Sequence, residues 1–380
     1  MRAAYRYPNR PAHRGVYFGF RCARVRSDAE PTTKPEQSQP GGATGAQPTL
    51  LRLDASPSPV RCALPQAPAF LIRTDREHLT FRRLTKPKWA SAIGRDRFGL
   101  WCEIAVEPKR GGEPVIQRLR WIPPGRFWMG SLEDEPGRYD GEGPRHQVTL
   151  TEGFWLFDTP CTQALWQAVM GNNPSQFQSP VRPVESVSWH DAQDFLARIN
   201  ARIPGLNLTL PSEAQWEHAC RAGTETAIYT GELTVLGERN APVLDPIAWY
   251  GGNSGVDFEL DDGYDSSGWP EKQYPHTKVG THSVKLKRAN PWGLYDMLGN
   301  VWEWTQDPWH ENYQGAPTDG SAWVGSDAGA SRVLRGGSWY HSARNVRAAS
   351  RYAIRPDDRI VNTGFRCARV RGEPGQPAAG

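Results

Sequence analysis

The sequence lacks three features that mark common classes of protein. It has no run of about 20 apolar residues, which a membrane-spanning helix requires, and its first residues lack the apolar core of a signal peptide. It has little excess of one charge, since 45 Lys and Arg face 41 Asp and Glu, which excludes a polyanion binder held by bulk charge. None of its six cysteines forms a CxxC pair, which argues against a zinc knuckle or a thioredoxin-like site. We therefore expect a cytoplasmic protein without membrane insertion, in which any site is local.

What the sequence has instead is large aromatic rings. It contains 16 Trp, although only 38% of its residues are apolar. The core is therefore expected to be built from a few large rings rather than from aliphatic volume. The abundance of Arg and of Pro, with only 4 Met, is typical of a heat-adapted or high-GC source.

Composition divides the chain into five parts. Residues 27–69 are rich in Pro, Ser, Thr, Gly and Gln and cannot bury enough surface to fold, which predicts a disordered linker. Residues 1–26, which precede it, duplicate part of the C-terminal region. After the linker we expect an N-terminal extension over 70–115, the main domain over 116–372 and a flexible tail over 373–380.

The main domain combines a few predicted helices with many short predicted strands. Ser188 and Ser212 stand where a helix N-cap is expected. The predicted helices are Thr162–Met170, Ser188–Ile203 and Ser212–Ala222. The predicted strands include Gln117–Ile122, Gln147–Leu150 and Gly153–Phe157, separated by Gly, Pro and Asp. This pattern indicates an α+β fold with much irregular structure.

An internal repeat is the most informative feature of the sequence. Arg2–Arg26 aligns without gaps with Arg347–Arg371, and 17 of the 25 positions are identical. The eight differences alter size or polarity, unlike drift in a packed core. In the C-terminal copy the differing positions are Ser350, Ala353, Ile354, Asp357, Asp358, Ile360, Asn362 and Thr363.

The residues at the differing positions share a coding property. In both copies they belong to the set encoded by NNC codons, which omits Met, Trp, Lys, Gln and Glu. Mutation confined to the adenines of an AAC codon would generate this set, and ordinary duplication with divergence is the alternative. Met1 stands opposite Val346. We therefore interpret residues 1–26 as the tail of an upstream variable domain. The chain would then be cut from a tandem polypeptide or carry a misplaced start.

Arginines recur every four residues in the repeat, at 347, 351, 355 and 359. Pro356 argues against a continuous basic helix there. Because these arginines are the same in both copies, we expect them to fix loop backbone through carbonyl and carboxylate hydrogen bonds. Nucleic-acid binding is accordingly not expected.

A series of motifs in order along the chain resembles the formylglycine-generating, sulfatase-modifying domain, which is a variant of the C-type lectin fold. The motifs are Arg120–Gly130 (RWIPPGRFWMG), Pro144–Leu150, Pro183–Trp189 (PVESVSW), Leu208–Ala222, Asn290–Thr305, Arg332–Trp339 (RVLRGGSW) and Gly364–Ala368 (GFRCA). The resemblance implies short sheets, Trp-rich loops and a last strand that returns beside the N-terminal part of the domain.

The enzymes of that family oxidise a substrate cysteine with two copper-binding cysteines, three and eight residues after the Ser of G-G-S. Here these places hold His341 and Val346, and valine has no donor atom for a metal. Related iron-dependent sulfoxide synthases use a histidine cluster, but the nine His show no HxxxH spacing. We therefore assign no catalytic residue and no catalytic cofactor. An oxidase or metal-dependent enzyme of the family remains the alternative.

The resemblance also implies a structural calcium ion. In the family such an ion is held by the loop that corresponds to Asp296–Glu303. Carboxylates of Asp296 and Glu303 and carbonyls of Gly299 and Val301 would supply the hard oxygen ligands that Ca²⁺ prefers. A hydrogen-bonded turn without metal is the alternative.

Within the family, the arginine frame and the terminal GFRCARV resemble the variable proteins of diversity-generating retroelements, of the type found in Thermus. In these a reverse transcriptase copies a template repeat, with adenine errors, into the 3′ end of the gene, and the variable side chains form a ligand-binding face. The resemblance implies a non-enzymatic recognition protein with a variable region over about residues 332–370, which binds a protein or other macromolecule. A signalling-associated scaffold is a further alternative.

The expected face mixes aromatic and small polar side chains, as antibody loops do. Its expected residues are Tyr340, His341, Ser342, Asn345, Ser350, Tyr352, Ala353, Ile354, Asp357, Asp358, Ile360, Asn362 and Thr363.

Overall fold

The computed structural model describes residues 70–73, 78–81, 85–109, 111–325 and 330–370. The predictions for residues 1–26, for the linker over 27–69 and for the tail over 373–380 lie outside the described residues. The first described strands, β1 (Phe70–Arg73) and β2 (His78–Phe81), pair as an antiparallel hairpin.

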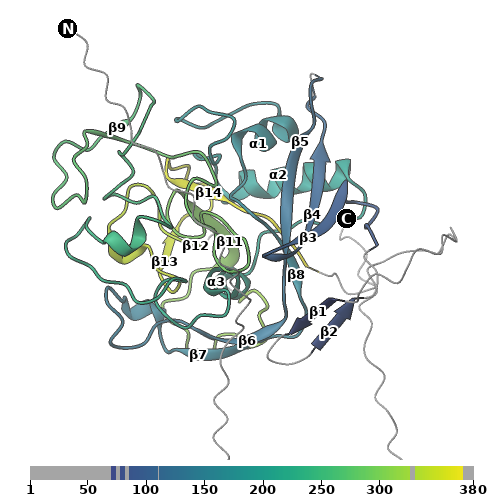
Figure 1. Ribbon diagram of the computed structural model, residues 1–380, viewed down its shortest axis with the longest axis horizontal. Helices are drawn as coiled ribbons and strands as arrows, with labels where there is room; N and C mark the ends of the chain where they lie inside the picture. The colour runs from purple at the N-terminus through teal and green to yellow at the C-terminus, as the bar shows by residue number, and fades with distance from the viewer. Residues whose placement is uncertain (1–69, 74–77, 82–84, 110, 326–329, 371–380) are drawn as a thin grey trace, which may run out of the picture. The chain divides into compact units, whose positions relative to one another are not determined.

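A five-stranded antiparallel sheet has the order β15-β8-β5-β4-β3 (Figure 1). Its strands are β3 (Ala92–Asp96), β4 (Gly99–Val106), β5 (Val115–Ile122), β8 (Phe154–Phe157) and β15 (Ala368–Arg369). Alternate residues of β4 are buried, as the two-residue period of a half-buried strand requires. Because β4 pairs with β5 and β3 pairs with β4, both strands are part of the main sheet although they lie in the expected N-terminal extension.

The three predicted helices are present with the expected caps. They are α1 (Gln163–Met170), α2 (Trp189–Arg202) and α3 (Glu213–Arg221). Ser188 and Ser212 each form a capping box with the third residue of the helix, which satisfies backbone N–H groups that would otherwise lack partners. Helices α1 and α2 pack together, and α1 covers β4 and β5 (Figure 1).

A second sheet of four strands has the order β13-β12-β11-β14. Its strands are β11 (Trp302–Pro308), β12 (Arg332–Arg335), β13 (Arg351–Ile354) and β14 (Thr363–Phe365). Strand β14 runs parallel to β11, and the other pairings are antiparallel. The sheet therefore brings the C-terminal repeat copy beside the rest of the domain.

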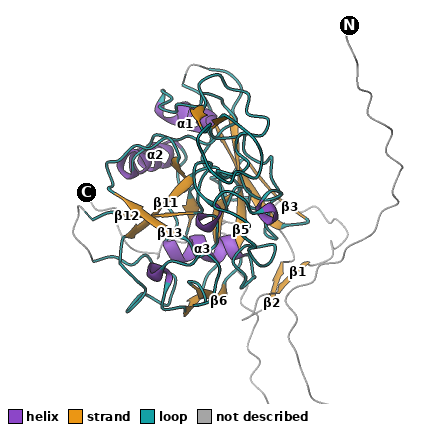
Figure 2. Ribbon diagram, turned by 90° about the vertical axis from the view of Figure 1, so that its left-hand side faces the viewer, coloured by secondary structure: helices purple, strands orange, loops and turns teal. Residues whose placement is uncertain are grey.

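The remaining regular elements are short. Strand β6 (Gly125–Met129) pairs with β7 (His146–Leu150), and β9 (Tyr264–Asp265) pairs with β10 (Lys278–Val279). The 3₁₀ helices are η1 (Asp140–Glu142), η2 (Pro242–Leu244) and η3 (Ala343–Asn345). Loops make up much of the domain (Figure 2), which confirms the α+β class with a large irregular fraction.

The core contains many large rings, but the expectation that rings replace aliphatic volume is wrong, because among the described residues 28 buried Leu, Ile and Val accompany 17 buried Trp, Phe and Tyr. Four tryptophans are fully buried: Trp216, Trp302, Trp304 and Trp339. The C-terminal strand β15 pairs with β8, so the last strand does return to an early one. Among the described residues, no helix is both long enough and apolar enough to span a membrane.

Candidate functional site

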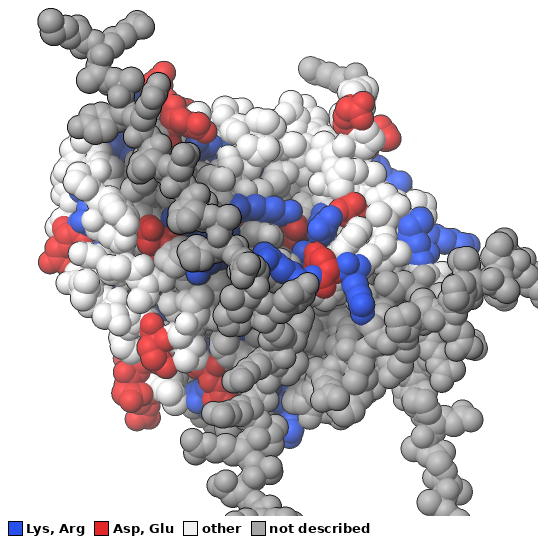
Figure 3. All heavy atoms as spheres, viewed as in Figure 1, with Lys and Arg blue, Asp and Glu red and all other residues white. Residues whose placement is uncertain are grey.

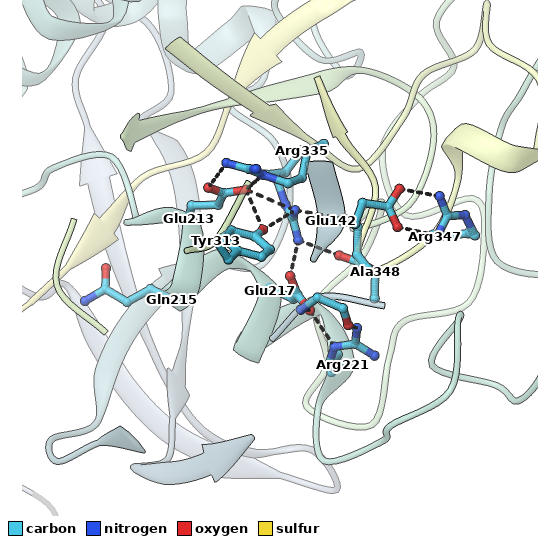
Figure 4. Close-up of polar contacts among 12 residues, drawn as sticks. Glu142, Glu213, Gln215, Glu217, Arg221, Tyr313, Arg335, Arg347 and Ala348 are labelled. Atoms are coloured by element: carbon cyan, nitrogen blue, oxygen red, sulfur yellow. Dashed lines mark hydrogen bonds and ion pairs between the residues drawn. The ribbon is translucent and has the colours of Figure 1, made fainter. Parts of the chain in front are cut away.

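A buried arginine joins the C-terminal segment to helix α3. The Nη2 atom of Arg335 is 2.5 Å from Glu217 Oε2, and its Nη1 atom is 3.2 Å from Glu213 Oε1 (Figure 4). The same guanidinium donates to the carbonyls of Ala348 and Ala349. All of these groups are buried, so the charges and the loop backbone satisfy one another in a medium where an unpaired charge is costly.

Two arginines of the repeat frame, Arg347 and Arg351, have the same role as Arg335. Arg347 binds both oxygens of Glu142, at 2.5 and 2.8 Å, and Glu135 at 2.6 Å. Burial alone lowers the pKa of Arg347, but the hydrogen bonds and charges of these carboxylates hold it above its usual value. Arg351 binds Glu213 through two hydrogen bonds, at 2.6 and 3.0 Å. The frame arginines therefore hold backbone and carboxylates, as the repeat predicts.

The exposed side of the same segment carries most of the predicted binding residues. Tyr352 is 46% exposed, and the Asp357 side chain is 85% exposed. Eight more of the expected residues are partly exposed, namely Tyr340, His341, Ser342, Asn345, Ala353, Ile354, Asp358 and Ile360.

These exposed residues form two groups. One is a row of rings: Tyr352 stacks on Trp302 with ring centres 5.7 Å apart, His341 lies 6.2 Å from Tyr352, and Tyr340 lies 5.5 Å from His341. The other group turns toward α2, where Asp357 Oδ1 lies 3.6 Å from His190 Nε2. The structure thus brings the aromatic members together and leaves the acidic ones at the opposite end of the loop.

His341 is fixed as a neutral donor. Its Nδ1 accepts a hydrogen bond from Trp302 Nε1 at 3.1 Å and lies 2.8 Å from Ser338 Oγ. Because an indole N–H only donates, Nδ1 carries no proton and the ring proton is on Nε2. Burial, followed by the charge of Arg239, lowers the pKa of His341 to about 4. The imidazole therefore stays uncharged at neutral pH.

Three predicted face residues are buried, which corrects the expectation that all thirteen share one exposed surface. Ser350 is 0% exposed, Thr363 is 1% exposed and Asn362 is 8% exposed. The N–H of Ser350 donates to the carbonyl of Arg347, so Ser350 is the last residue of a turn. Thr363 begins β14, and the carbonyl of Asn362 accepts from Trp302 N in the adjoining strand. Sequence comparison cannot reveal this, because a differing position carries no sign of its depth.

The positions of the family's copper cysteines are unsuited to metal in this chain. Val346 is fully buried, and His341 uses Nδ1 within the protein. The four described cysteines, Cys102, Cys161, Cys220 and Cys367, are buried, and burial raises the pKa of each. A thiolate that could bind copper is therefore not offered by these four residues.

The predicted calcium ligands Asp296, Gly299, Val301 and Glu303 lie in and just after the turn that leads into β11. Arg366 pairs with both oxygens of Glu303, each at 2.7 Å, and Trp216 Nε1 donates to the same carboxylate. A cation bound there would have to displace a buried guanidinium, so the structure does not favour the residues as a metal site. Calcium remains a prediction. No group of three or more His, Cys, Asp or Glu within the described part of the chain is arranged to hold a metal.

A neighbouring surface that the sequence analysis did not single out continues the row of rings. Trp269 lies 5.1 Å from Tyr340, and Tyr264 lies 5.5 Å from Tyr340 and is 42% exposed. Both come from residues 257–279, which are rich in aromatic and acidic residues. This composition is the feature of the sequence that could have pointed to the segment as a binding surface. Only the fold shows that the segment lies against Tyr340.

The comparison with known domain families identifies the domain. The model of the sulfatase-modifying factor enzyme 1-like domain matches residues 107–371. The chain belongs to this family. Its fold is accordingly the formylglycine-generating-enzyme-like variant of the C-type lectin fold.

Relatives and a similar structure differ in activity. The formylglycine-generating enzyme of Thermomonospora curvata is 28% identical over 69% of this chain and 96% of its own length. The inactive Cα-formylglycine-generating enzyme 2 of Bos taurus is 28% identical over 73% of this chain and 93% of its own length. Among solved structures, Treponema denticola variable protein 1 matches with a TM-score of 0.51 and 29% identity, covering 67% of this chain and 95% of that one. The sequence relatives thus include an active and an inactive enzyme, and a variable protein has a similar structure.

Proposed function

We propose that this chain is a non-enzymatic binding protein whose exposed C-terminal surface is diversified by a retroelement through adenine-directed mutation, as in the variable proteins of the Thermus type. The observation that carries the proposal is the division within the repeat. Five of the eight differing positions are at least partly exposed, at 353, 354, 357, 358 and 360. The shared arginines Arg347, Arg351 and Arg366 are buried and paired with carboxylates.

The surface suits recognition better than chemistry. Its rings offer rigid amphipathic area, and small polar side chains such as Ser342 and Asn345 lose little rotamer entropy on binding. A catalytic shell must hold its geometry to about half an ångström, which substitution at many positions would not preserve. The replacement of the copper cysteines by His341 and Val346 supports the same conclusion.

The proposed ligand is a protein or another macromolecule. Nucleic acid is not favoured, because three shared arginines are buried in ion pairs and Arg359 binds Asp191. In the view of Figure 3, basic and acidic side chains lie among one another, and neither sign covers the described surface. Binding by a broad positive field, as phosphate backbones require, has no support there.

Sequencing of this gene and its flanking DNA in many cells of the source strain tests the proposal. We expect a nearby template repeat and substitutions confined to adenines, falling at the differing positions and at codons for 340, 341, 342 and 345. A fixed 3′ end without a template repeat would contradict diversification. Metal analysis and a thiol-oxidation assay on the purified protein would then test the enzymatic alternative.

A further inference from the structure

An aromatic surface adjoins the predicted face but lies outside the repeat. The rings of Tyr264, Trp269 and Tyr340 are mutually in contact, with centres 5.1 to 6.2 Å apart. Tyr340 is perpendicular to both of the others, at 86° and 85°. Buried Trp339 lies beneath, 5.9 Å from Tyr264 and 5.6 Å from Tyr340. The surface therefore presents ring faces and edges held in fixed orientations.

The charge around these rings is negative. Residues 257–279 contain six Asp and Glu but only two Lys, whereas the whole chain has a net charge of +4. Asp261 and Asp262 stand three and two residues before Tyr264 in this loop, and both are exposed. In the described ranges neither carboxylate lies within ion-pair distance of a Lys or Arg, although the charge of Asp262 acts on Arg182, whose pKa burial lowers. The loop that carries Tyr264 therefore has exposed negative charge that is not held in a close ion pair.

The cations near the rings are already engaged. Lys278 Nζ donates to the carbonyl of Asp261 at 2.7 Å. Lys272 Nζ donates to the carbonyls of Ser266 and His276, at 2.9 and 2.6 Å. Arg239 lies over Trp269, 4.8 Å from the ring centre, and pairs with Glu238 at 2.7 Å. The guanidinium of Arg239 therefore already lies over the ring of Trp269, so a cation can contact a ring of this cluster.

We infer that Tyr264, Trp269 and Tyr340, with the carboxylates of Asp261 and Asp262, form a binding surface for a protein segment that presents Lys or Arg side chains. A cation is attracted to the face of a Tyr or Trp ring, and a nearby carboxylate adds charge complementarity. The surface is continuous through Tyr340 with the predicted diversified face. The inference rests on the proposed binding function but not on diversification, because four of its five residues lie outside the repeat and the predicted variable region.

The first experiment uses the full chain and a fluorescein-labelled peptide of alternating Lys and Gly, followed by anisotropy. A peptide of alternating Glu and Gly is the negative probe. We expect the Lys peptide to bind, and we expect its affinity to fall by about tenfold between about 50 and about 300 mM salt, because exposed charge pairs are screened. No binding of the Lys peptide, or equal binding of both peptides, would overturn the inference.

Two matched variants separate this surface from bulk charge. Asp261→Asn with Asp262→Asn removes two charges beside the rings, whereas Glu133→Gln with Asp134→Asn removes two from another exposed stretch. We expect the affinity for the Lys peptide to fall by roughly tenfold in the first variant and by less than about twofold in the second. An equal loss in both would show non-specific attraction and overturn the assignment.

A ring substitution tests the aromatic part. Tyr264→Phe keeps the ring face and should bind the Lys peptide as the unaltered chain does, whereas Tyr264→Ala should weaken it by about threefold to fivefold. Equal affinity of the two variants would exclude a role for the ring. These outcomes are independent of the gene sequencing, so a chain with a fixed 3′ end could still bind the Lys peptide, and a diversified chain could fail to bind it.

Discussion

The buried and the exposed sides of the C-terminal segment differ in how their charges are treated. On the buried side, Arg335 and Arg347 meet Glu217 and Glu142 with side chains that are 0 to 1% exposed. On the exposed side, Arg355 pairs with Asp358, but its side chain is 79% exposed. Removing one partner of a buried ion pair strongly lowers the free energy of unfolding, whereas an exposed ion pair contributes little to it. One segment therefore combines a frame that must stay constant with a surface that can change.

The largest expected effect comes from breaking the buried side. Arg335→Met removes one of the two guanidinium groups that bind Glu217, since Arg221 remains at 2.8 Å, and leaves the carbonyls of Ala348 and Ala349 without this donor. We expect the free energy of unfolding to fall by about 3 kcal/mol or more, because the substitution breaks a buried ion-pair network and leaves Glu217 Oε2 and two buried carbonyls without their donor. Urea unfolding followed by tryptophan fluorescence measures the loss.

Arg355→Met is the matched control, since it removes the same charge from an exposed pair. Its expected loss is below about 1 kcal/mol. If the two variants were equally stable, the contrast between buried and exposed arginines would have no energetic meaning.

An intermediate effect follows from transplanting residues of the first repeat copy into the buried positions. Ser350→Tyr, Asn362→Tyr and Thr363→Phe each place a ring where the present side chain is at most 8% exposed. Overpacking of this kind typically costs about 1–3 kcal/mol for each site. Thermal and urea unfolding of the three single variants would measure it. Unchanged stability would mean that the loop repacks freely and that these positions also vary without cost.

Sequence predicts the frame of this molecule better than its surface. The helices beginning after Thr162, Ser188 and Ser212 were predictable because caps and periodicity act locally. The role of Arg347 was predictable because two copies of the segment share it. The burial of Ser350 was not predictable, because depth depends on pairings over long separations. The contact of Trp269 with Tyr340 likewise depends on tertiary packing.

A smaller effect concerns the histidine of the exposed face. The pKa of His341 is lowered from 6.5 to about 4, mainly by burial, so the unfolded chain takes up a proton at a higher pH than the folded one. His276 and His282 behave alike. Their contribution to stability is therefore lost as the pH falls from about 6.5 to about 4. Burial raises the pKa values of Asp307 and Glu185 to about 7. These two carboxyls act in the opposite sense, since their contribution to stability is lost as the pH rises through about 7.

His341→Asn isolates the histidine from these opposing carboxyls. The variant should lose less stability than the unaltered chain between about pH 6.5 and pH 4, because it lacks the imidazole whose pKa is lowered in the folded chain. His190→Asn, at a side chain that is 55% exposed, is the matched control for the loss of an imidazole. Identical profiles for His341→Asn and the unaltered chain would show that the imidazole is not held neutral by its burial.

The smallest expected effect comes from transplanting the exposed positions. Asp357→Ala with Asp358→His copies Ala12 and His13 of the first repeat into the loop. Asp357 is 3.6 Å from His190, and Asp358 lies 3.0 Å from Arg355, both in solvent-exposed pairs. We expect a change in the free energy of unfolding within about 0.5 kcal/mol, as for surface substitutions in general. A shift of the urea midpoint without a change in slope would measure it. A loss as large as that of Ser350→Tyr would mean that the loop is part of the frame, and the exposed side could then not be diversified without loss of folding.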